Sequence, residues 1–290
     1  MKDKKIVIIG GGPAGISASL YTARAGIHTT VIGRDGGALV KTDKIENYYG
    51  FSQPVSGREL LEAGQQQAQR LGVELVSGEV LSIGFLDRFT VSTGEQTFEG
   101  DAVILATGAA RSTPKIPGID RLEGKGVSYC AVCDAFFYRG REVAVLGGGE
   151  YALHEARELL PVAGGVTLLT NGVEPTGISA ALPKGLQVVK KKLSRLEGED
   201  QLESVVFEDG SRIPLAGLFV AVGVASSSDL ARKIGAAVEG SKILVNELME
   251  TTVPGLFAAG DCTGGLLQIS KAVYEGAKAA VEAIRFVRQE

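Results

Sequence analysis

Short hydrophobic runs that end at glycine-rich turns set the architecture of this chain. Residues 5–9 predict a buried strand, the apolar spacing of residues 17–25 predicts a helix, and residues 29–32 predict a second strand. A strand, a helix and a strand within about 30 residues form the unit that surrounds dinucleotide-binding glycine turns. The chain is therefore predicted to begin with a βαβ unit.

A second βαβ unit is predicted further along. Residues 141–146 read as a strand, a helical pattern runs through Leu160, and residues 166–169 read as the next strand. Two stretches between these units are β-type, residues 89–91 and 102–105. Near the end of the chain we predict a strand that ends in Gly-Asp, residues 256–261, and then a helix, residues 268–287. Two such units predict an α/β protein with two Rossmann-like domains, doubly wound in three layers, and Pro114, Pro117 and Gly118 mark a plausible domain junction.

Composition excludes several classes of protein. The 290 residues are 44% hydrophobic and 22% charged, as in ordinary globular proteins. A net charge of −4 argues against a nucleic-acid partner, and no apolar run reaches the roughly 18 residues of a membrane span. The first residues resemble no signal peptide, and three cysteines are not the framework of a secreted disulfide-rich domain. We expect a cytoplasmic protein.

The first glycine turn has the spacing of a nucleotide-binding fingerprint. Gly10 permits a tight turn, Gly12 lets the backbone approach a pyrophosphate, and Gly15 lets the helix pack on the strand. Asp35 follows Gly15 by 20 residues, where an acid can accept hydrogen bonds from a ribose. The alternative is a glycine turn that binds nothing, and the complete βαβ context favours a nucleotide.

Cys130 and Cys133 form a C-x-x-C pair followed by Asp134. Zinc needs four ligands, and neither His28 nor His154 has a second ligand beside it. Two inert buried cysteines are the other alternative. A redox-active pair is favoured, and Asp134 is a candidate for the proton transfer that exchange requires unless it is a solvated loop acid.

Two further features have simpler interpretations. Cys262 has no partner in sequence and is predicted to be a small buried side chain. The basic run Lys190, Lys191 and Lys192 with Arg195 is predicted to be a solvated strand face that could dock an acidic partner.

The order of these motifs resembles the low-molecular-weight thioredoxin reductases over essentially the whole chain. The matching segments are Gly-Gly-Gly-Pro-Ala-Gly at 10–15, Ile-Glu-Asn-Tyr-Tyr-Gly-Phe at 45–51, Ala-Thr-Gly at 106–108, Cys-Ala-Val-Cys-Asp at 130–134, Gly-Gly-Gly-Glu-Tyr-Ala at 147–152 and Val-Pro-Gly-Leu-Phe-Ala-Ala-Gly-Asp at 253–261.

This resemblance implies that FAD binds at the first glycine turn. It places Gly260 and Asp261 at the ribityl chain, and Gln268 and Ile269 near the flavin ring. It also assigns further positions to the cofactor: Pro13, Ala14, Gly37, Ala38, Leu39, Asn47, Val80, Thr107 and Gly108.

The resemblance also implies a domain organisation. A discontinuous FAD domain would comprise residues 1–115 and 246–290, and an inserted pyridine-nucleotide-type domain, residues 116–245, would carry the cysteines. The family works as a homodimer and rotates one domain so that the dithiol can leave the flavin and meet thioredoxin.

The sequence departs from the family where NADPH would bind. NADPH-using members carry a His-Arg-Arg-x-x-x-Arg cluster after the strand that follows the second glycine turn; here that segment runs from Thr170 and Asn171 to Glu174 without a basic residue. Each charge-assisted bond to the 2′-phosphate is worth about 1.5–3 kcal/mol, so losing two or three weakens binding by roughly 10³-fold. Tyr151 replaces a small serine and is expected to crowd the helix N-terminus. Smaller departures are Ala38 for Gln, Leu267 for Arg and Ala135 for Gly.

These departures make the chain most similar to the ferredoxin-dependent flavin thioredoxin reductases, with NADPH an unlikely donor. In that mechanism Cys133 is the sulfur nearer the flavin, Cys130 attacks thioredoxin, and Asp134 donates and accepts the proton. Three alternatives stay open: an NADH-dependent reductase with Glu174 at the adenine ribose, a small-molecule dithiol oxidase, and a non-catalytic flavin sensor or scaffold. The intact C-x-x-C-Asp motif argues against the last.

Overall fold

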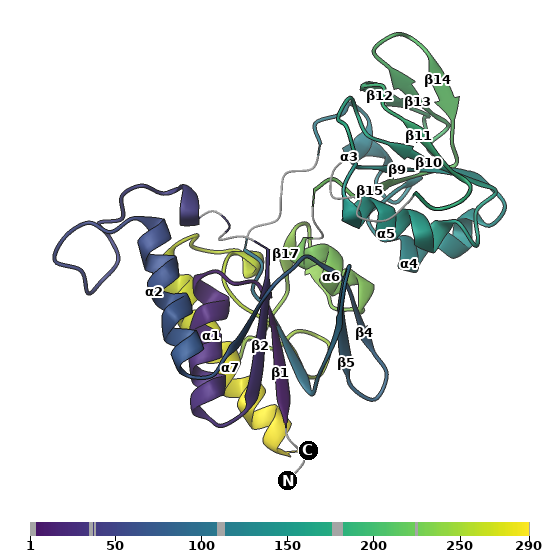
Figure 1. The fold of residues 1–290 in the computed structure, drawn as a ribbon. Helices are drawn as coiled ribbons and strands as arrows, with labels where there is room; N and C mark the ends of the chain where they lie inside the picture. Colours follow the sequence, from purple (N-terminus) through teal and green to yellow (C-terminus); the bar gives the residue numbers. More distant parts are fainter. Residues whose placement is uncertain are drawn as a thin grey trace. The chain divides into compact units, whose positions relative to one another are not determined.

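The chain divides into two compact units. This computed structural model describes residues 4–34, 37, 39–108, 114–175, 182–223 and 226–289. One unit comprises Met1–Ala110 and Ser226–Glu290, and the other comprises Arg111–Ala225, so the second unit is inserted into the first along the chain (Figure 1).

The chain returns to the first unit earlier than the predicted residue 246. Helix α6 (Ser227–Lys233) packs against strand β4 (Val80–Phe85), and Lys233 Nζ donates a hydrogen bond to the Leu81 carbonyl oxygen at 3.3 Å. Residues 226–245 therefore belong to the first unit, because their contacts lie there. The signals at Pro114 and Gly118 lie close to the first crossing and gave no indication of the second.

A five-stranded parallel sheet forms the centre of the first unit. In spatial order its strands are β18 (Leu256–Ala258), β7 (Ala102–Leu105), β1 (Lys5–Ile9), β2 (His28–Gly33) and β3 (Glu74–Ser77). All four residues of β7 are buried, as expected for a central strand covered on both faces.

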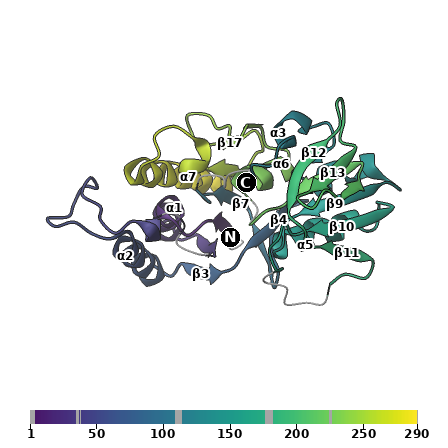
Figure 2. The ribbon, with the colours of Figure 1, turned by 90° about the horizontal axis from the view of Figure 1, so that it is seen from above.

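Different layers cover the two faces of this sheet (Figures 1 and 2). The helical layer consists of α1 (Pro13–Arg24), α2 (Gly57–Arg70) and α7 (Ile269–Gln289). The other layer is an antiparallel sheet of β4, β5 (Phe89–Thr93) and β6 (Thr97–Gly100). Helix α1 begins at Pro13 and not at the predicted residue 17, because Gly12 serves as its N-cap and the proline ring suits the first helical position.

The remaining short elements of the first unit lie in its connections. They are η1 (Leu39–Lys41), β16 (Val238–Glu239), β17 (Lys242–Ile243) and η3 (Asp261–Thr263).

The second unit repeats the same architecture. Its parallel sheet has the order β11 (Leu186–Val189), β10 (Gly165–Leu169), β9 (Glu142–Leu146), β15 (Gly217–Val220) and β8 (Val127–Ser128). Helices α4 (Ala131–Asp134) and α5 (Glu150–Leu159) lie on one face, and an antiparallel sheet lies on the other: β12 (Leu193–Glu197), β13 (Ser204–Phe207) and β14 (Arg212–Pro214). Short helices α3 (Ile119–Leu122) and η2 (Ala135–Tyr138) complete it.

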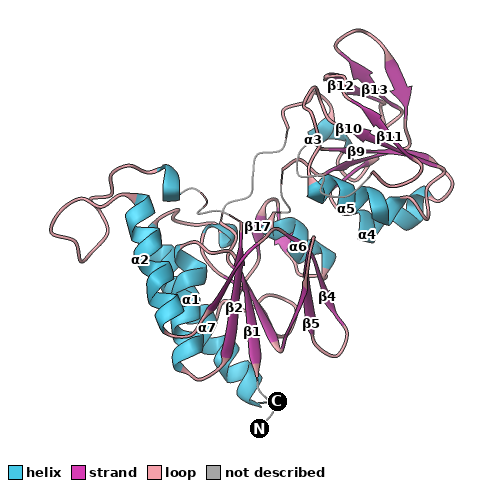
Figure 3. Cartoon of the chain, viewed as in Figure 1, coloured by secondary structure: helices cyan, strands magenta, loops and turns pink. Residues whose placement is uncertain are grey.

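Each unit therefore has a layer of helices, a parallel sheet and a small antiparallel sheet (Figure 3). The predicted α/β class with two Rossmann-like units is confirmed. In such folds ligands bind at the carboxyl ends of the parallel strands, which is where both glycine turns begin. None of the helices described here is long and apolar enough to cross a membrane.

Candidate active site

The first glycine turn is tight on its inner side and open on its outer side. A Cβ at Gly10 would overlap the carbonyl oxygen of Ala106, and one at Gly15 would overlap the carbonyl oxygen of Gly10. At Gly11 and Gly12 an added Cβ would meet no described atom within 4 Å. The backbone of this turn can therefore be approached closely by a ligand.

The amino end of α1 has the properties of an anion site. Its N-cap is Gly12, and no side chain caps the first backbone N–H groups. Uncapped N–H groups at a helix N-terminus favour a phosphate. A cavity of about 370 Å³ lies beside the turn, lined by Arg34 and by residues of β2, β3 and α2 that include Gly33, Arg58 and Ser77. The turn, the uncapped helix and the cavity together fit a dinucleotide.

Sequence-distant candidates meet at the same edge of this sheet. Thr107 and Gly108 follow β7, and Gly260 and Asp261 follow β18, its hydrogen-bonded neighbour. The adjacent β1 leads into Gly10. Because these strands are parallel, their carboxyl ends lie together, so the structure brings these positions to the first glycine turn. The Thr107 hydroxyl also contacts the hydroxyl of Ser227 in α6.

The loop before α2 is tied to the amino end of α7. Asn47 Nδ2 donates to Gln268 Oε1 at 3.0 Å, although the two residues are 221 positions apart. Ile269 packs against the small core of Leu39, Ile45 and Leu61. Four predicted cofactor residues, Leu39, Asn47, Gln268 and Ile269, thus lie together.

Other predicted cofactor positions are less informative. Val80 is buried at the start of β4, and Gly37 is exposed with φ of 62°. Asp35 and Ala38 lie outside the described residues. Their cofactor roles stay predictions.

An ion pair that the sequence reading missed supports the turn after β18. Lys271 Nζ lies 2.9 Å from Glu275 Oε2 and donates to the Gly260 carbonyl oxygen at 2.8 Å. The same Glu275 oxygen accepts the Gly260 N–H at 2.9 Å. Burial raises the pKa of the neighbouring Asp261 carboxyl, with the Lys271 charge acting in the opposite direction. The Lys-x-x-x-Glu spacing on a predicted helix was the available signal.

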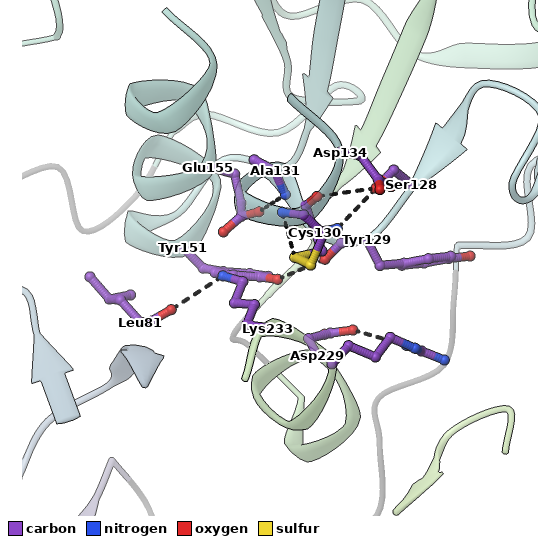
Figure 4. The surroundings of a disulfide bond; sticks show 12 residues. Leu81, Ser128, Tyr129, Cys130, Ala131, Asp134, Tyr151, Glu155, Asp229 and Lys233 are labelled. Carbon is purple, nitrogen blue, oxygen red and sulfur yellow. Dashed lines mark hydrogen bonds and ion pairs between the residues drawn. A yellow bond between two sulfur atoms is a disulfide. The ribbon is translucent and has the colours of Figure 1, made fainter. Parts of the chain in front are cut away.

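Cys130 and Cys133 form a disulfide at the start of the short helix α4 (Figure 4). Cys130 is its N-cap, and the Cys133 N–H donates to Cys130 Sγ at 3.2 Å. Cys130 is only 5% exposed, whereas Cys133 is exposed. Cys133 is therefore the accessible sulfur in this structure.

Asp134 is linked to Cys130 through a serine. The Ser128 hydroxyl donates to Asp134 Oδ2 at 2.7 Å and accepts the Cys130 N–H at 3.0 Å. Asp134 also acts on Tyr138, whose pKa is raised by burial and by the Asp134 charge. The Asp134 carboxylate is thus part of the cysteine site and not a detached loop acid. No sequence signal pointed to Ser128.

The second glycine turn has closer neighbours on its outer side than the first. A Cβ at Gly147 would overlap the carbonyl oxygen of Ala221, much as in the first turn. However, one at Gly148 would lie 3.7 Å from Pro175 Cα, and one at Gly149 would lie 3.6 Å from the Gly223 carbonyl oxygen. These are ordinary van der Waals distances for an added Cβ, so the second turn has nearer neighbours than Gly11 and Gly12 have. Crowding by Tyr151 stays a prediction. Tyr151 is 1% exposed, and its hydroxyl lies 3.5 Å from the Tyr129 carbonyl oxygen, directed toward the segment that precedes α4 (Figure 4).

The predicted basic docking face is largely neutralised. Lys190 Nζ lies 2.7 Å from Glu174, Lys191 Nζ lies 2.7 Å from Asp209, and Arg195 lies 2.6 Å from Glu197. The three cations are about half exposed, which agrees with the predicted solvated face, and carboxylates of neighbouring strands and loops pair with them. Docking of an acidic partner on this face stays a prediction.

The lysines nevertheless lie beside the end of β10. Lys190 pairs with Glu174, and the stem of Lys192 lies against Gly172. Asn171 Oδ1 accepts the Leu193 N–H at 2.8 Å. Sequence reasoning considered only the strand's own residues and missed these neighbours.

Cys262 is buried, as predicted, with 1% of its surface exposed. Its Sγ lies 3.3 Å from the Ala259 carbonyl oxygen, and burial raises the thiol pKa to about 12. Across the described part of the chain, no three His, Cys, Asp or Glu side chains are grouped so that they could hold a metal ion.

Comparison with known proteins gives one consistent result. Residues 4–276 match the family model for pyridine nucleotide-disulphide oxidoreductases. The thioredoxin reductase of Peptoclostridium acidaminophilum is 34% identical, with 97% of this chain and 96% of that protein covered.

Two solved structures are informative. The atypical thioredoxin reductase TRi from Desulfovibrio vulgaris Hildenborough is 43% identical with a TM-score of 0.92, covering 99% of both chains. A ferredoxin-flavin thioredoxin reductase from Clostridium acetobutylicum is 32% identical with a TM-score of 0.73, also covering 99% of both chains. With its glycine turns and its C-x-x-C disulfide, the chain belongs to the thioredoxin reductases of the pyridine nucleotide-disulphide oxidoreductase family.

Proposed function

We propose that this protein passes electrons from FAD to the Cys130–Cys133 disulfide and then to thioredoxin, with reduced ferredoxin and not NADPH as the donor. The observation that carries the proposal is the disulfide itself: it joins one exposed and one buried cysteine on a helix whose Asp134 is hydrogen-bonded to the same segment. The thioredoxin reductases to which the chain is similar support the assignment of the substrate.

The residues around the first glycine turn fit FAD. Gly12 and the amino end of α1 would hold the pyrophosphate, and Asp261, Gln268 and Ile269 would line the remainder of the cofactor. When bound, FAD supplies a carrier that accepts electrons singly or in pairs and can release a pair to a disulfide. The Lys271–Glu275 pair holds the Gly260 peptide in place for this contact.

Exchange with thioredoxin then requires a thiolate. After reduction, we assign Cys130 as the thiolate that attacks the thioredoxin disulfide, because the Cys133 N–H already points at its Sγ and would stabilise the negative charge. A mixed disulfide forms, Cys133 attacks Cys130 Sγ, and thioredoxin leaves with two thiols while the Cys130–Cys133 bond is restored. Since Cys130 is buried here, this assignment requires a movement that uncovers it.

Asp134 is the proposed proton carrier. Its carboxylate reaches the Cys130 backbone through the Ser128 hydroxyl, so it lies within the same hydrogen-bonded segment as the sulfur that must lose and regain a proton. A carboxylate in this position can accept the proton of the attacking thiol and return it to the thiolate that leaves.

The donor part of the proposal rests on the second unit. Backbone atoms of Pro175 and Gly223 lie within 4 Å of where a Cβ on Gly148 or Gly149 would be, so this turn has less open space beside it than the first. The end of β10 offers the neutral Thr170 and Asn171. A loss of charge-assisted bonds to the 2′-phosphate weakens NADPH binding steeply. The structural similarity to a ferredoxin-flavin thioredoxin reductase supports ferredoxin as the donor.

One observation favours a second candidate, an NADPH-dependent reductase. Lys190 and Lys192 lie beside the end of β10 and could supply positive charge from the neighbouring segment. Glu174 is already paired with Lys190, which weakens the idea that it holds the ribose of NADH.

Anaerobic reduction of the bound flavin decides the donor. NADPH, NADH and reduced ferredoxin would each be added to the oxidised holoenzyme, with bleaching of the visible flavin absorbance followed over time. We expect ferredoxin alone to bleach the flavin and then to support reduction of thioredoxin. Rapid bleaching by micromolar NADPH, lost in Lys192→Met, would establish the second candidate instead.

The same preparations test the remaining alternatives. Oxygen consumption with small dithiols, without thioredoxin turnover, would identify a dithiol oxidase. A flavin that bleaches while thioredoxin stays oxidised would identify a sensor or scaffold. Homodimer formation and cytoplasmic location stay predictions.

A further inference from the structure

A buried acid from α5 lies against the redox helix. Glu155 is 1% exposed, and its Oε2 accepts the Ala131 N–H at 2.8 Å (Figure 4). Ala131 is the residue directly after Cys130 and the first residue of α4. A charged side chain is rarely fully buried unless it is bound to a specific partner, so this position is an unusual one for glutamate.

Glu155 and Cys130 both accept hydrogen bonds from backbone N–H groups at the amino end of α4. The Cys133 N–H donates to Cys130 Sγ at 3.2 Å, while the Ala131 N–H donates to Glu155. One turn earlier on α5, Tyr151 reaches toward the carbonyl oxygen of Tyr129, the residue before Cys130. Helix α5 therefore contacts the backbone on both sides of Cys130.

We propose that Glu155 is a positioning residue that makes the Cys130–Cys133 pair a stronger reductant, because its carboxylate disfavours a second negative charge on Cys130. The inference rests on the redox centre proposed above and deepens it. It assigns a role to the helix that follows the second glycine turn.

The direction of the expected change in reduction potential follows from the chemistry of dithiols. A negative charge close to a thiolate destabilises the reduced form relative to the disulfide, and a dithiol whose reduced form is destabilised gives up its electrons more readily. Other titratable groups on the elements packed together here are Asp134 on α4 itself, Tyr138 in η2, and Glu150, Tyr151, His154, Arg157 and Glu158 on α5. Asp134 is bound to Ser128.

The substitution Glu155→Gln tests the effect of the side chain's negative charge while keeping its size and its hydrogen-bond acceptor. The amide oxygen of glutamine can still accept the Ala131 N–H, whereas the negative charge is lost. Glu158→Gln is the matched control, since Glu158 is exposed on the same helix and its removal changes the net charge equally. Flavin absorbance and an unchanged thermal transition would show that each variant is folded.

The first measurement is the equilibrium with glutathione in the full holoenzyme. Two glutathione thiols are oxidised to one glutathione disulfide while the Cys130–Cys133 bond is reduced to two thiols. At a pH above the Cys130 thiol pKa of both proteins, we expect the equilibrium for Glu155→Gln to shift about tenfold toward the reduced form, equivalent to a potential about 30 mV more positive. For Glu158→Gln we expect no shift.

The second measurement is the pH dependence of Cys130 alkylation in a Cys133→Ser background. Cys262 reacts slowly there, because burial raises its pKa to about 12. Glu155→Gln should lower the Cys130 thiol pKa by about one unit. An unchanged equilibrium and an unchanged alkylation profile in Glu155→Gln would overturn the proposal and leave Glu155 a purely structural residue. Neither measurement uses thioredoxin, ferredoxin or a nicotinamide nucleotide, so a protein that shows the shift but fails to reduce thioredoxin would contradict only the proposed function.

Discussion

The two glycine turns of this chain have nearly the same backbone and different surroundings. Gly10 and Gly147 both have positive φ, 116° and 154°, and both lie against a carbonyl oxygen of the neighbouring strand's end. Gly12 and Gly149 are both N-caps of a helix without a capping side chain. Outside Gly11 and Gly12 the space is open among the described residues, whereas an added Cβ would lie 3.7 Å from Pro175 Cα at Gly148 and 3.6 Å from the Gly223 carbonyl oxygen at Gly149.

The comparison separates the fold requirement of a fingerprint from its binding function. The first glycine of each turn is needed because no Cβ fits there, whatever the site binds. Binding depends on what the following loops do, and these lie far from the motif in sequence. A glycine pattern therefore predicts the turn more securely than it predicts the ligand.

Introducing a negative charge into each glycine turn in separate variants should give the largest difference in FAD binding between the two turns. We expect Gly12→Asp to abolish FAD binding, because the carboxylate would occupy the N–H groups that a pyrophosphate needs, although aspartate is an acceptable N-cap for folding. Gly149→Asp should keep about one FAD per chain and normal thioredoxin reduction from ferredoxin. Flavin content after reconstitution is the measurement. Equal flavin loss in both variants would remove the distinction between the turns.

Cys130→Ser and Cys133→Ser should each abolish thioredoxin reduction while leaving FAD bound. Exchange needs one sulfur to attack and another to resolve the mixed disulfide. Cys262→Ser should retain most activity, because Cys262 is buried away from exchange. With one motif cysteine left, we expect Cys133→Ser to accumulate a mixed disulfide with thioredoxin through Cys130. If the mixed disulfide with thioredoxin accumulated in Cys130→Ser instead, Cys133 would be the attacking cysteine and Cys130 the resolving one. That result would agree with the greater exposure of Cys133.

Asp134→Asn should slow turnover roughly 10²-fold, the usual scale for a proton-transfer group. The amide keeps the size of the side chain and can still accept from the Ser128 hydroxyl, so folding should be unaffected. Asp120→Asn, an exposed acid on α3, is the control. Steady-state turnover as a function of pH is the measurement, and an unchanged rate would show that Asp134 carries no proton.

Lys271→Met should weaken FAD binding by about tenfold. The charge-assisted bonds from Lys271 hold the Gly260 carbonyl and Glu275, and each such bond is worth about 1.5–3 kcal/mol before the chain adjusts. Lys278→Met, on the same helix and over the ring of Tyr274, should leave the affinity unchanged. Flavin fluorescence titration distinguishes the two variants. Equal affinities would show that Gly260 is held well enough by the strand alone.

The smallest expected effect concerns stability at high pH. Burial raises the Cys262 pKa from 9.0 to about 12, so above pH 9 the unfolded chain ionises this thiol while the folded chain does not. Stability is therefore lost as the pH rises from 9 toward 12, by about 1 kcal/mol between pH 9 and pH 10. The Tm of Cys262→Ala should fall less steeply over this range. The same slope of Tm against pH in the variant and the wild type would contradict this prediction.

Local patterns along the chain were sufficient for the strands beside the glycine turns and for the C-x-x-C-Asp motif, whereas β3, β8, β11 and β15 were not predicted. Residues 5–9 and 166–169 coincide with strands because short apolar runs next to glycine turns have few other structures available. The C-x-x-C-Asp run likewise carries its chemistry within five residues. Features whose cause is local could be read from the sequence.

Features that depend on partners distant in sequence could not be predicted from the sequence. Glu155 lies on the apolar side of α5 between Ala152 and Leu159, a position that hinted at a special role but not at Ala131 as its partner. The neutralisation of Lys191 by Asp209 depends on how two strands are joined, and the return of residues 226–245 to the first unit depends on packing against β4. Each requires knowledge of the three-dimensional arrangement.

The pairing of β18 with β7 also sets an order of assembly during synthesis. The inserted unit, Arg111–Ala225, is continuous and has all of its strands once residue 220 has left the ribosome. The first unit still lacks β18 and α7, which supply an edge strand and part of the helical cover of its sheet. Domains generally fold as units when their chain is complete. The unit that begins first in the chain is therefore completed last, and a nascent chain that ends before α7 would have its cysteine pair but no finished flavin site.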